Sequence, residues 1–290
     1  MEPESNLKKS LDSGIFTITA EICPPRGTLV DSFVGKARLL KGKIAAANVT
    51  DNQRAVMRLS SLASSVLLLR EGVEPVFQIT CRDRNRLAIQ SDMLGAWVLG
   101  IRNVLALTGD HVSFGDHREA KAVYDLDSVQ LVRAIDALNH GKNLKEKELR
   151  GGTGFFLGAV VAPEAEPFEP EWIKFGKKVG AGARFFQTQA VFDMERFKRF
   201  FPGARGLGAK VLGGILLLKS AKMAHYLNKN VPGVRVPASL IEELENAPDQ
   251  LKKGIEIAAR QLRELKKFCH GAHIMAIGQE ESVPEIIGLS

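Results

Sequence analysis

The chain has 290 residues, of which 45% are hydrophobic and 25% charged, with 27 Gly and 12 Pro. This composition is typical of a folded globular protein, and it excludes the collagen-like, disordered and coiled-coil classes. Lys and Arg outnumber Asp and Glu by 40 to 33, and the resulting net charge of +7 favours an anionic ligand or partner in a general way. The basic residues are dispersed and form no recognition module, so we expect no nucleic-acid partner.

The cysteines and the apolar runs indicate the compartment. Cys23, Cys81 and Cys269 are too few and too scattered for a disulfide framework, or for a zinc site built by this chain alone. The N-terminus is polar and lacks the apolar core of a signal peptide. The longest apolar runs, 66–69 and 212–218, fall far short of the roughly 20 residues of a membrane span. We expect a cytoplasmic protein without a membrane partner.

Short β-rich runs alternate with longer amphipathic stretches along the chain. The predicted strands are 15–20, 43–49, 75–80, 103–107, 155–161, 184–188, 210–216 and 273–277. Helical periodicity covers 30–40, 55–70, 85–99, 128–138, 171–179, 194–201, 221–228 and 250–268, and short helices are predicted after Pro237 and after Pro284.

Strands separated by helices pair in parallel, and about eight such units in roughly 250 to 300 residues predict a (β/α)8 TIM barrel. No break in composition marks a second domain, so residues 1–290 are expected to form one barrel, with extra helices between strands 7 and 8. A doubly wound sheet is the alternative. That fold predicts a glycine fingerprint after the first strand, where this chain has EICPPRG instead.

Successive side chains of a strand point to opposite faces of the sheet, so each predicted strand can be divided into two sets of residues. The bulky set is expected beneath the helices and the small or polar set inside the barrel; on the fourth strand this places Ala106 inside and Leu105 and Leu107 outside. The polar sets end at the C-terminal strand ends, where barrel active sites form. These polar strand ends are Glu21, Thr50, Thr80, Asp110 and Gln189.

Residues at these strand ends and near them could also serve only the fold, as ion pairs, helix caps, surface charges or packing residues. Glu21 could pair with Arg26, and Asp110 or Asp83 could cap the following helix. Lys178, on a predicted helix, is by default a solvated charge. Cys23 and Cys81 have no neighbouring His in the sequence, so they are interpreted as packing residues.

At these strand ends the sequence resembles the methylenetetrahydrofolate reductase family of flavin-containing (β/α)8 barrels. The resemblance covers nearly the whole chain. It rests on these segments in order: AEICPPRG (20–27), NVTDNQ (48–53), QITCRDRN (78–85), LALTGD (105–110), KKVGAGARFFQTQAVFD (177–193), GGILLLKSAKM (213–223) and VRVP (234–237).

The resemblance implies reduction of the methylene group of 5,10-methylenetetrahydrofolate to the methyl group of 5-methyltetrahydrofolate, by hydride transfer from N5 of reduced flavin. Glu21 resembles the general acid that protonates the folate nitrogen as its five-membered ring opens. Asp110 resembles the aspartate that contacts the pterin near the flavin and supports catalysis there. Gln189 resembles the glutamine that hydrogen-bonds the folate.

The resemblance also implies a flavin site and an electron donor. The residues implied in cofactor binding are Thr50, Gln78, Thr80, Thr108, Gly109, Asp110, Asp125, Lys174, Lys177 and Lys178. The expected cofactor is FAD. FMN stays open, because Gln78 stands where better-known bacterial relatives carry His and the loop after the fifth strand is shorter. The donor is left open among NADH, NADPH and reduced ferredoxin.

Partners and a second function stay open at the level of the sequence. The pattern is closer to the branch found in one-carbon and acetyl-CoA pathways of anaerobes, where a cysteine-rich partner subunit can supply electrons. A homo-oligomer is a further alternative. The chain could also be a non-reducing folate-binding or flavin electron-transfer subunit of a larger methyl-transfer assembly.

Overall fold

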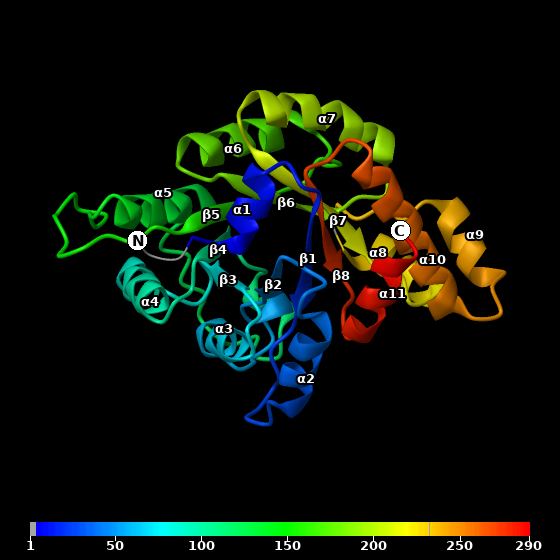
Figure 1. Ribbon diagram of the computed structural model, residues 1–290, viewed down its shortest axis with the longest axis horizontal. Coiled ribbons are helices and arrows are strands. Elements are labelled where there is room, and N and C mark those ends of the chain that lie inside the picture. The colour runs from blue at the N-terminus through cyan, green and yellow to red at the C-terminus, as the bar shows by residue number, and fades with distance from the viewer. Residues whose placement is uncertain (1–3, 232) are drawn as a thin grey trace.

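The computed structural model describes residues 4–231 and 233–290, in which eight parallel strands close into a barrel in sequence order (Figure 1). The fold class predicted from the sequence is confirmed. The strands are β1 (Thr17–Ile22), β2 (Ala46–Val49), β3 (Pro75–Thr80), β4 (Asn103–Leu107), β5 (Phe156–Val161), β6 (Phe185–Ala190), β7 (Lys210–Leu216) and β8 (Gly271–Met275). β1 closes the barrel by pairing with β8, with Thr17 opposite Gly271.

Helices surround the barrel, and the predicted extra helices lie between β7 and β8 (Figure 1). Their bounds are α1 (Asn6–Asp12), α2 (Asp31–Leu40), α3 (Ser61–Arg70), α4 (Arg86–Val98), α5 (Ser128–Asn139), α6 (Glu169–Gly180), α7 (Met194–Gly206), α8 (Ala221–Asn230), α9 (Ala238–Glu245), α10 (Gln250–Lys266) and α11 (Val283–Gly288). Short 3-10 helices follow β2, β4 and β8: η1 (Gln53–Ala55), η2 (Val112–Phe114) and η3 (Glu280–Ser282).

Side-chain caps fix where several helices begin. Asp127 and Gln130 form a capping box at the start of α5, with the Asp127 carboxylate accepting from the backbone of Gln130 at 2.8 Å. Asn85 accepts from two backbone N–H groups at the start of α4. Because these caps stand directly after the β3 and β4 loops, they hold those loops in place at the mouth of the barrel.

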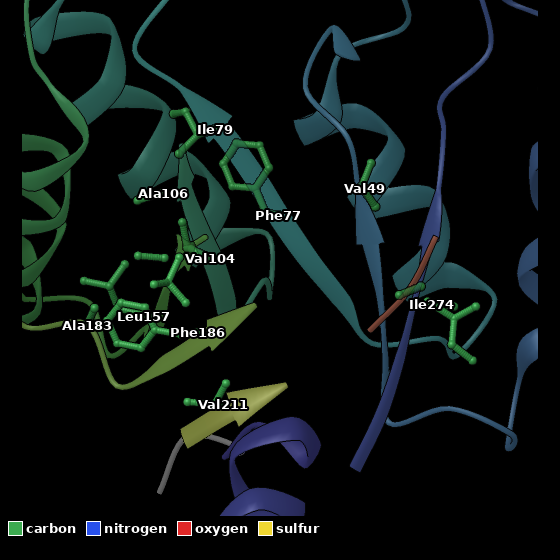
Figure 2. Close-up of a cluster of buried hydrophobic side chains, with 14 of the residues drawn as sticks. Val49, Phe77, Ile79, Val104, Ala106, Leu157, Ala183, Phe186, Val211 and Ile274 are labelled. Carbon is green, nitrogen blue, oxygen red and sulfur yellow. The ribbon is translucent and has the colours of Figure 1, made fainter. Parts of the chain in front are cut away.

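The main hydrophobic core lies between the strands and the helices (Figure 2). Phe77 and Ile79 of β3 and Val104 and Ala106 of β4 are fully or almost fully buried in it. The predicted orientation of β4 is therefore wrong. Leu105 packs inside the barrel, while the smaller Ala106 faces the helices. Leu105 packs there in one cluster with Val76 and Leu212.

α1 lies across the N-terminal end of the barrel, and the sequence reasoning missed it. Leu7 and Leu11 of α1 join an interior cluster that contains Phe156 and Phe185, whose rings stack at 4.8 Å. The Glu74 carboxylate accepts from the first backbone N–H groups of the helix, at 2.8 Å from Asn6 N. Two leucines thus close the bottom of the barrel and leave its polar mouth as the open end.

Candidate active site at the C-terminal mouth of the barrel

A cavity of about 470 Å³ opens at the C-terminal ends of the strands. This volume is within the usual range for sites of small organic ligands and cofactors. Side chains from β1, β3, β4, β6 and β8 line it, together with the side chains of α6 that face the mouth. The polar residues that line it are Glu21, Asp51, Gln53, Gln78, Thr80, Arg82, Thr108, Asp110, Ser128, Glu171, Lys174, Lys178, Gln187, Thr188, Gln189 and His273.

Glu21 lies at the end of β1 and is only 8% exposed. Its Oε1 accepts a 2.8 Å hydrogen bond from Nε2 of Gln53. Burial raises the pKa of Glu21 to about 7, and the negative charge of Glu280 also raises it, whereas hydrogen bonds from Gln53 and Gln78 lower it. A carboxyl with this pKa is present in both protonation states near neutral pH, as a proton donor requires.

A hydrogen-bonded polar layer lies below Glu21, inside the barrel. The side-chain amides of Asn48 and Gln187 exchange two hydrogen bonds, at 2.7 and 3.0 Å. Gln187 Nε2 also donates to Thr19 Oγ1 at 3.3 Å, and Thr19 Oγ1 is 2.9 Å from Nδ1 of His273. Burial lowers the pKa of His273 to about 3, so its ring is neutral at physiological pH. This layer forms an uncharged floor beneath the acid.

Charged pairs hold the loops after β2 and β3. Both the backbone N–H and the Oγ1 of Thr80 donate to Asp51 at 2.9 Å. Asp51 also forms an ion pair with Arg84, whose Nη1 lies 2.8 Å from Oδ2 of Asp51. Arg82, only 2% exposed, binds the Asp83 carboxylate through Nε at 2.7 Å and Nη2 at 2.6 Å. Because these bidentate pairs restrict the loops, the cavity wall on this side is preorganised.

Asp110 follows β4 at the rim and is exposed. Its Oδ2 accepts from the backbone N–H of Arg54 at 3.0 Å, which ties the β4 loop to η1. Gly109, just before it, has φ +86°, and a Cβ there would lie 2.9 Å from Cβ of Thr80. A glycine is therefore needed for the close approach of these two loops, and this approach places the Asp110 carboxylate.

α6 presents lysines to the opposite wall. Lys178 is 5% exposed, and its Nζ donates to the carbonyl oxygen of Val160 at 2.6 Å. Burial lowers the pKa of Lys178 to about 8. Lys174, one turn earlier, is exposed at the rim and also lines the cavity. The default interpretation of Lys178 as a solvated charge is therefore wrong.

Most of the residues predicted from the sequence come together around this cavity. Those that line it are Glu21, Gln78, Thr80, Thr108, Gly109, Asp110, Lys174, Lys178 and Gln189. Thr50, Asp125 and Lys177 lie outside the lining. Thr50 is buried, and its Oγ1 donates to Sγ of Cys23 at 3.3 Å. Asp125 instead pairs with Arg86 at 2.8 Å. The ion pair of Glu21 with Arg26 that the sequence left open is not among the described contacts.

Sequence reasoning missed several cavity residues. Gln53 belongs to the NVTDNQ segment, but it lies in η1 beyond the strand, where alternation gives no information. Gln187 and Gln189 stand two residues apart on β6, and this alternation is the signal that could have selected Gln187. Arg82 and His273 carried no spacing signal. The position of His273 depends on the closure of the barrel, which brings β8 beside β1. That of Arg82 depends on its contacts with Asp83 and the loop after β2.

The closed barrel, with a polar cavity and a buried acid at its C-terminal mouth, defines the class of (β/α)8-barrel enzymes. The family profile described as "Methylenetetrahydrofolate reductase" matches residues 6–289. The chain belongs to the methylenetetrahydrofolate reductase family, and it is accordingly an oxidoreductase of one-carbon metabolism.

Individual relatives agree with this assignment. The chain is 26% identical over 266 residues to the 5,10-methylenetetrahydrofolate reductase of Pectobacterium carotovorum, covering 88% of this chain and 83% of that protein. It is 24% identical over 261 residues to the Escherichia coli reductase, with 88% and 82% covered. A Clostridium thermocellum protein described as binding two copies of 5-methyl-5,6,7,8-tetrahydrofolic acid shares the fold, with a TM-score of 0.69, 17% identity and coverage of 98% and 97%.

Two absences apply to the described part of the chain. Between residues 4 and 231 and between 233 and 290, no helix has the length and apolar character to cross a membrane. Within the same ranges, no three His, Cys, Asp or Glu side chains are grouped so that they could hold a metal ion.

Proposed function

We propose that this chain reduces 5,10-methylenetetrahydrofolate to 5-methyltetrahydrofolate with a flavin bound in the mouth cavity, and that Glu21 is the general acid. The single observation that carries the proposal is the placement of Glu21. It is buried in a ligand-sized cavity, with a pKa raised to about 7. Methylenetetrahydrofolate reduction in general follows from the family, and the roles of individual residues are our proposal.

The residues of the cavity fit a flavin. The volume of about 470 Å³ suits a planar ring system, and the lining combines apolar strand residues with side-chain amides and hydroxyls. Lys174 and Lys178 on one wall are suited to a phosphate group, because an ammonium in a partly dry site binds an anion more strongly than one in water. The proposed cofactor is FAD, with FMN as the alternative. When bound, the flavin supplies the hydride.

Glu21 provides the proton that the departing folate nitrogen needs. The acid must be protonated before reaction, and burial favours the protonated form. The hydrogen bond from Gln53 stabilises the carboxylate left after the proton is given away. The uncharged floor below, with neutral His273, adds no competing acid near neutral pH.

Asp110 and Gln189 are proposed to bind the pterin. Both line the cavity at its exposed rim, Asp110 in the loop after β4 and Gln189 on β6. The Asp110 carboxylate is placed by the N–H of Arg54, and its negative charge can stabilise a cation that develops on the substrate. The Gln189 amide can both donate to and accept from the pterin ring edge.

The remaining features of the system are proposals of the same kind. We propose a cytoplasmic enzyme whose residues 1–290 act as one barrel domain. Its electrons come from NADH, NADPH or reduced ferredoxin, the last through a cysteine-rich partner subunit, and a homo-oligomer stays an alternative. The methyltetrahydrofolate described for the Clostridium thermocellum protein supports a folate substrate for this fold.

The test starts from the purified protein. Its visible spectrum and the mass of any released flavin identify the cofactor. Anaerobic reduction with each of the three donors, followed by addition of methylenetetrahydrofolate, measures both half-reactions. A protein with no flavin, and none after reconstitution, contradicts the proposal. Flavin reduction without folate turnover contradicts it in favour of an electron-transfer subunit.

A further inference from the structure

Cys23 directly follows β1 at the mouth of the barrel, where its side chain is half-buried. Its sulfur accepts a hydrogen bond from Oγ1 of Thr50 at 3.3 Å, and its thiol donates to Oε1 of Gln53 at 3.5 Å. Nε2 of the same Gln53 amide donates to Oε1 of Glu21 at 2.8 Å. These three bonds form one chain of donors that runs from Thr50 to the buried carboxyl of Glu21.

Each group in this chain has a proton for the bond that it donates. The Thr50 side chain is buried, and its hydroxyl has a single proton, which it donates to the sulfur of Cys23. Burial raises the pKa of the Cys23 thiol, so the thiol keeps its proton near neutral pH and can donate it to Gln53. A side-chain amide has an acceptor at one end and a donor at the other. Because the thiol binds the oxygen of the amide, the NH2 group is directed to Glu21.

The orientation of the Gln53 amide decides what the proton of Glu21 can do. The backbone beside Gln53 is held by the hydrogen bond from the N–H of Arg54 to Asp110, so the amide orientation depends on the partners of the side chain itself. A reversed amide would present Oε1 to Glu21, accept the proton of the neutral acid and withdraw it from the cavity. In the observed orientation Gln53 donates to Glu21, and the acidic proton stays available to a ligand.

We propose that Cys23 is a positioning residue for folate reduction, and that its thiol holds the Gln53 amide with the NH2 group toward Glu21. This inference rests on the proposed function, because it takes Glu21 as the general acid. The interpretation of Cys23 as a packing residue is therefore incomplete. An apolar side chain of similar size would fill the same space, but it would give Gln53 no donor.

Charged groups around Glu21 stay in place when Cys23 is replaced. Glu280 of η3 acts on Glu21 through its negative charge, and its Oε2 lies 2.6 Å from Nζ of Lys36 in α2. The positive charge of Arg58 lowers the pKa of Cys23, against the larger effect of burial. The polar layer below Glu21 is uncharged. Since Cys23→Ala removes a neutral thiol, a change in the protonation of Glu21 in this variant reports on hydrogen bonding.

The first test measures the pH profile of the folate half-reaction. In Cys23→Ala the amide is free to reverse, so we expect the rate below the descending limb to fall about fivefold, the value of one ordinary hydrogen bond. The limb should move to higher pH, because the reversed amide stabilises the neutral acid. Reduction of the flavin by the donor should not change. Cys23→Ser keeps a donor and an acceptor and should restore the wild-type rate and profile.

The matched control is Cys269→Ala. Cys269 is also half-buried and donates to the carbonyl oxygen of Val211 at 3.2 Å, but it lies at the opposite end of the barrel, just before β8. Cys269→Ala should change neither the rate nor the profile. A Cys23→Ala variant with the wild-type rate and profile, or a Cys23→Ser variant that behaves like Cys23→Ala, overturns the inference.

A double-variant cycle tests whether Cys23 acts through Gln53. In the Gln53→Ala background, Cys23→Ala should have no further effect on the rate or on the position of the limb, because the amide that the thiol holds is already absent. Full additivity of the two substitutions would overturn the inference and assign the effect of Cys23→Ala to packing.

Direct titration of Glu21 separates this inference from the proposed function. Carbon-13 NMR of the purified protein with labelled glutamate follows the Glu21 carboxyl, identified by the signal that Glu21→Gln lacks, and needs no turnover. A pKa of Glu21 that is higher in Cys23→Ala and unchanged in Cys23→Ser supports the positioning role, even if no folate is reduced. The same pKa in Cys23→Ala and the wild type overturns that role and leaves the reductase activity standing.

Discussion

The side chain of Gln53, in the short helix after β2, donates a 2.8 Å hydrogen bond to the buried carboxylate of Glu21 at the end of β1. This bond stabilises the ionised form and lowers the pKa of Glu21. Burial, which is the larger effect, and the negative charge of Glu280 both raise it, to a net value of about 7. The pKa of Glu21 is therefore the balance of opposing contributions from its own burial, from Gln53 and from Glu280.

These contributions predict opposite pH shifts in two variants. Folate reduction should fall as the pH rises through about 7, because Glu21 must be protonated. Gln53→Ala removes a contribution that lowers the pKa, so its descending limb should move to higher pH. Glu280→Gln removes a contribution that raises the pKa, so its limb should move to lower pH. The measurement is the pH profile of the folate half-reaction.

Glu281→Gln is the matched control for Glu280→Gln, because Glu281 is exposed and adjacent in the chain. Other groups near Glu21 are Gln78, which bonds to it, and the Cys23 thiol, whose pKa burial raises. Cys23 should therefore stay neutral across the measured range. Shifts in the same direction for Gln53→Ala and Glu280→Gln would rule out Glu21 as the titrating group.

A second prediction concerns stability. The pKa of Glu21 rises from 4.5 to about 7 on folding, so the folded state binds more protons between these values and stability falls as pH rises through this window. Ionised Glu21 costs about 3 kcal/mol above pH 7. Glu21→Gln should therefore increase the free energy of unfolding at pH 8 by up to about 3 kcal/mol and change it little at pH 4.5. The measurement is urea unfolding of Glu21→Gln and the wild type at both pH values. Equal gains in the free energy of unfolding at pH 4.5 and pH 8 would contradict the burial of a charge at Glu21.

Lys178→Met should separate cofactor binding from stability. The pKa of Lys178 falls from 10.5 to about 8 on folding, so stability rises with pH between these values and the charged form costs stability below pH 8. Methionine removes that cost and leaves the carbonyl oxygen of Val160 without its donor, for a net gain of about 1–2 kcal/mol at pH 7. Flavin affinity should fall about 10- to 100-fold.

Flavin titration of Lys178→Met measures the flavin affinity, and urea unfolding measures the free energy of unfolding. Lys145→Met, in an exposed loop at the other end of the barrel, is the control and should change neither. Unchanged flavin affinity in Lys178→Met would remove Lys178 from the proposed phosphate site. A loss of stability would show that the ammonium is better solvated than its burial indicates.

Gly109→Ala tests the link between the β3 and β4 loops. Its positive φ disfavours any side chain, and the new Cβ would collide with Thr80 at 2.9 Å. Gly208 has a similar φ of +74° but open space around it, so Gly208→Ala carries the backbone strain alone, about 1 kcal/mol. Gly109→Ala should lose more stability than Gly208→Ala and raise the KM for folate by displacing Asp110. Equal losses in both variants would show that the contact with Thr80 is not needed.

The barrel could be predicted from the sequence because its strands and the longer helices between them each carry a local pattern of apolar residues. The bounds of β3, β4 and β7 agree with the prediction. Alternation alone could not orient β4, because Leu105 and Ala106 are both apolar and only the volume of the closed barrel decides which one faces inward. α1 was missed because only two of its residues, Leu7 and Leu11, are buried.

The polar strand ends Glu21, Thr80 and Gln189 were found because parallel strands end at one rim. Gln53 and Glu280 lie in loops, and their effect on Glu21 depends on tertiary placement that no spacing encodes. The state of Lys178 was likewise hidden, because the burial of a helix residue depends on which face packs against the strands.

The role of Glu21 is tested most directly by anaerobic stopped-flow spectroscopy of the flavin-loaded protein. We expect Glu21→Gln to accept electrons from the donor at the wild-type rate, and reoxidation of its flavin by methylenetetrahydrofolate to slow by at least about 100-fold. Reoxidation of Glu21→Gln at the wild-type rate, or equal loss of both half-reactions, would contradict Glu21 as the general acid.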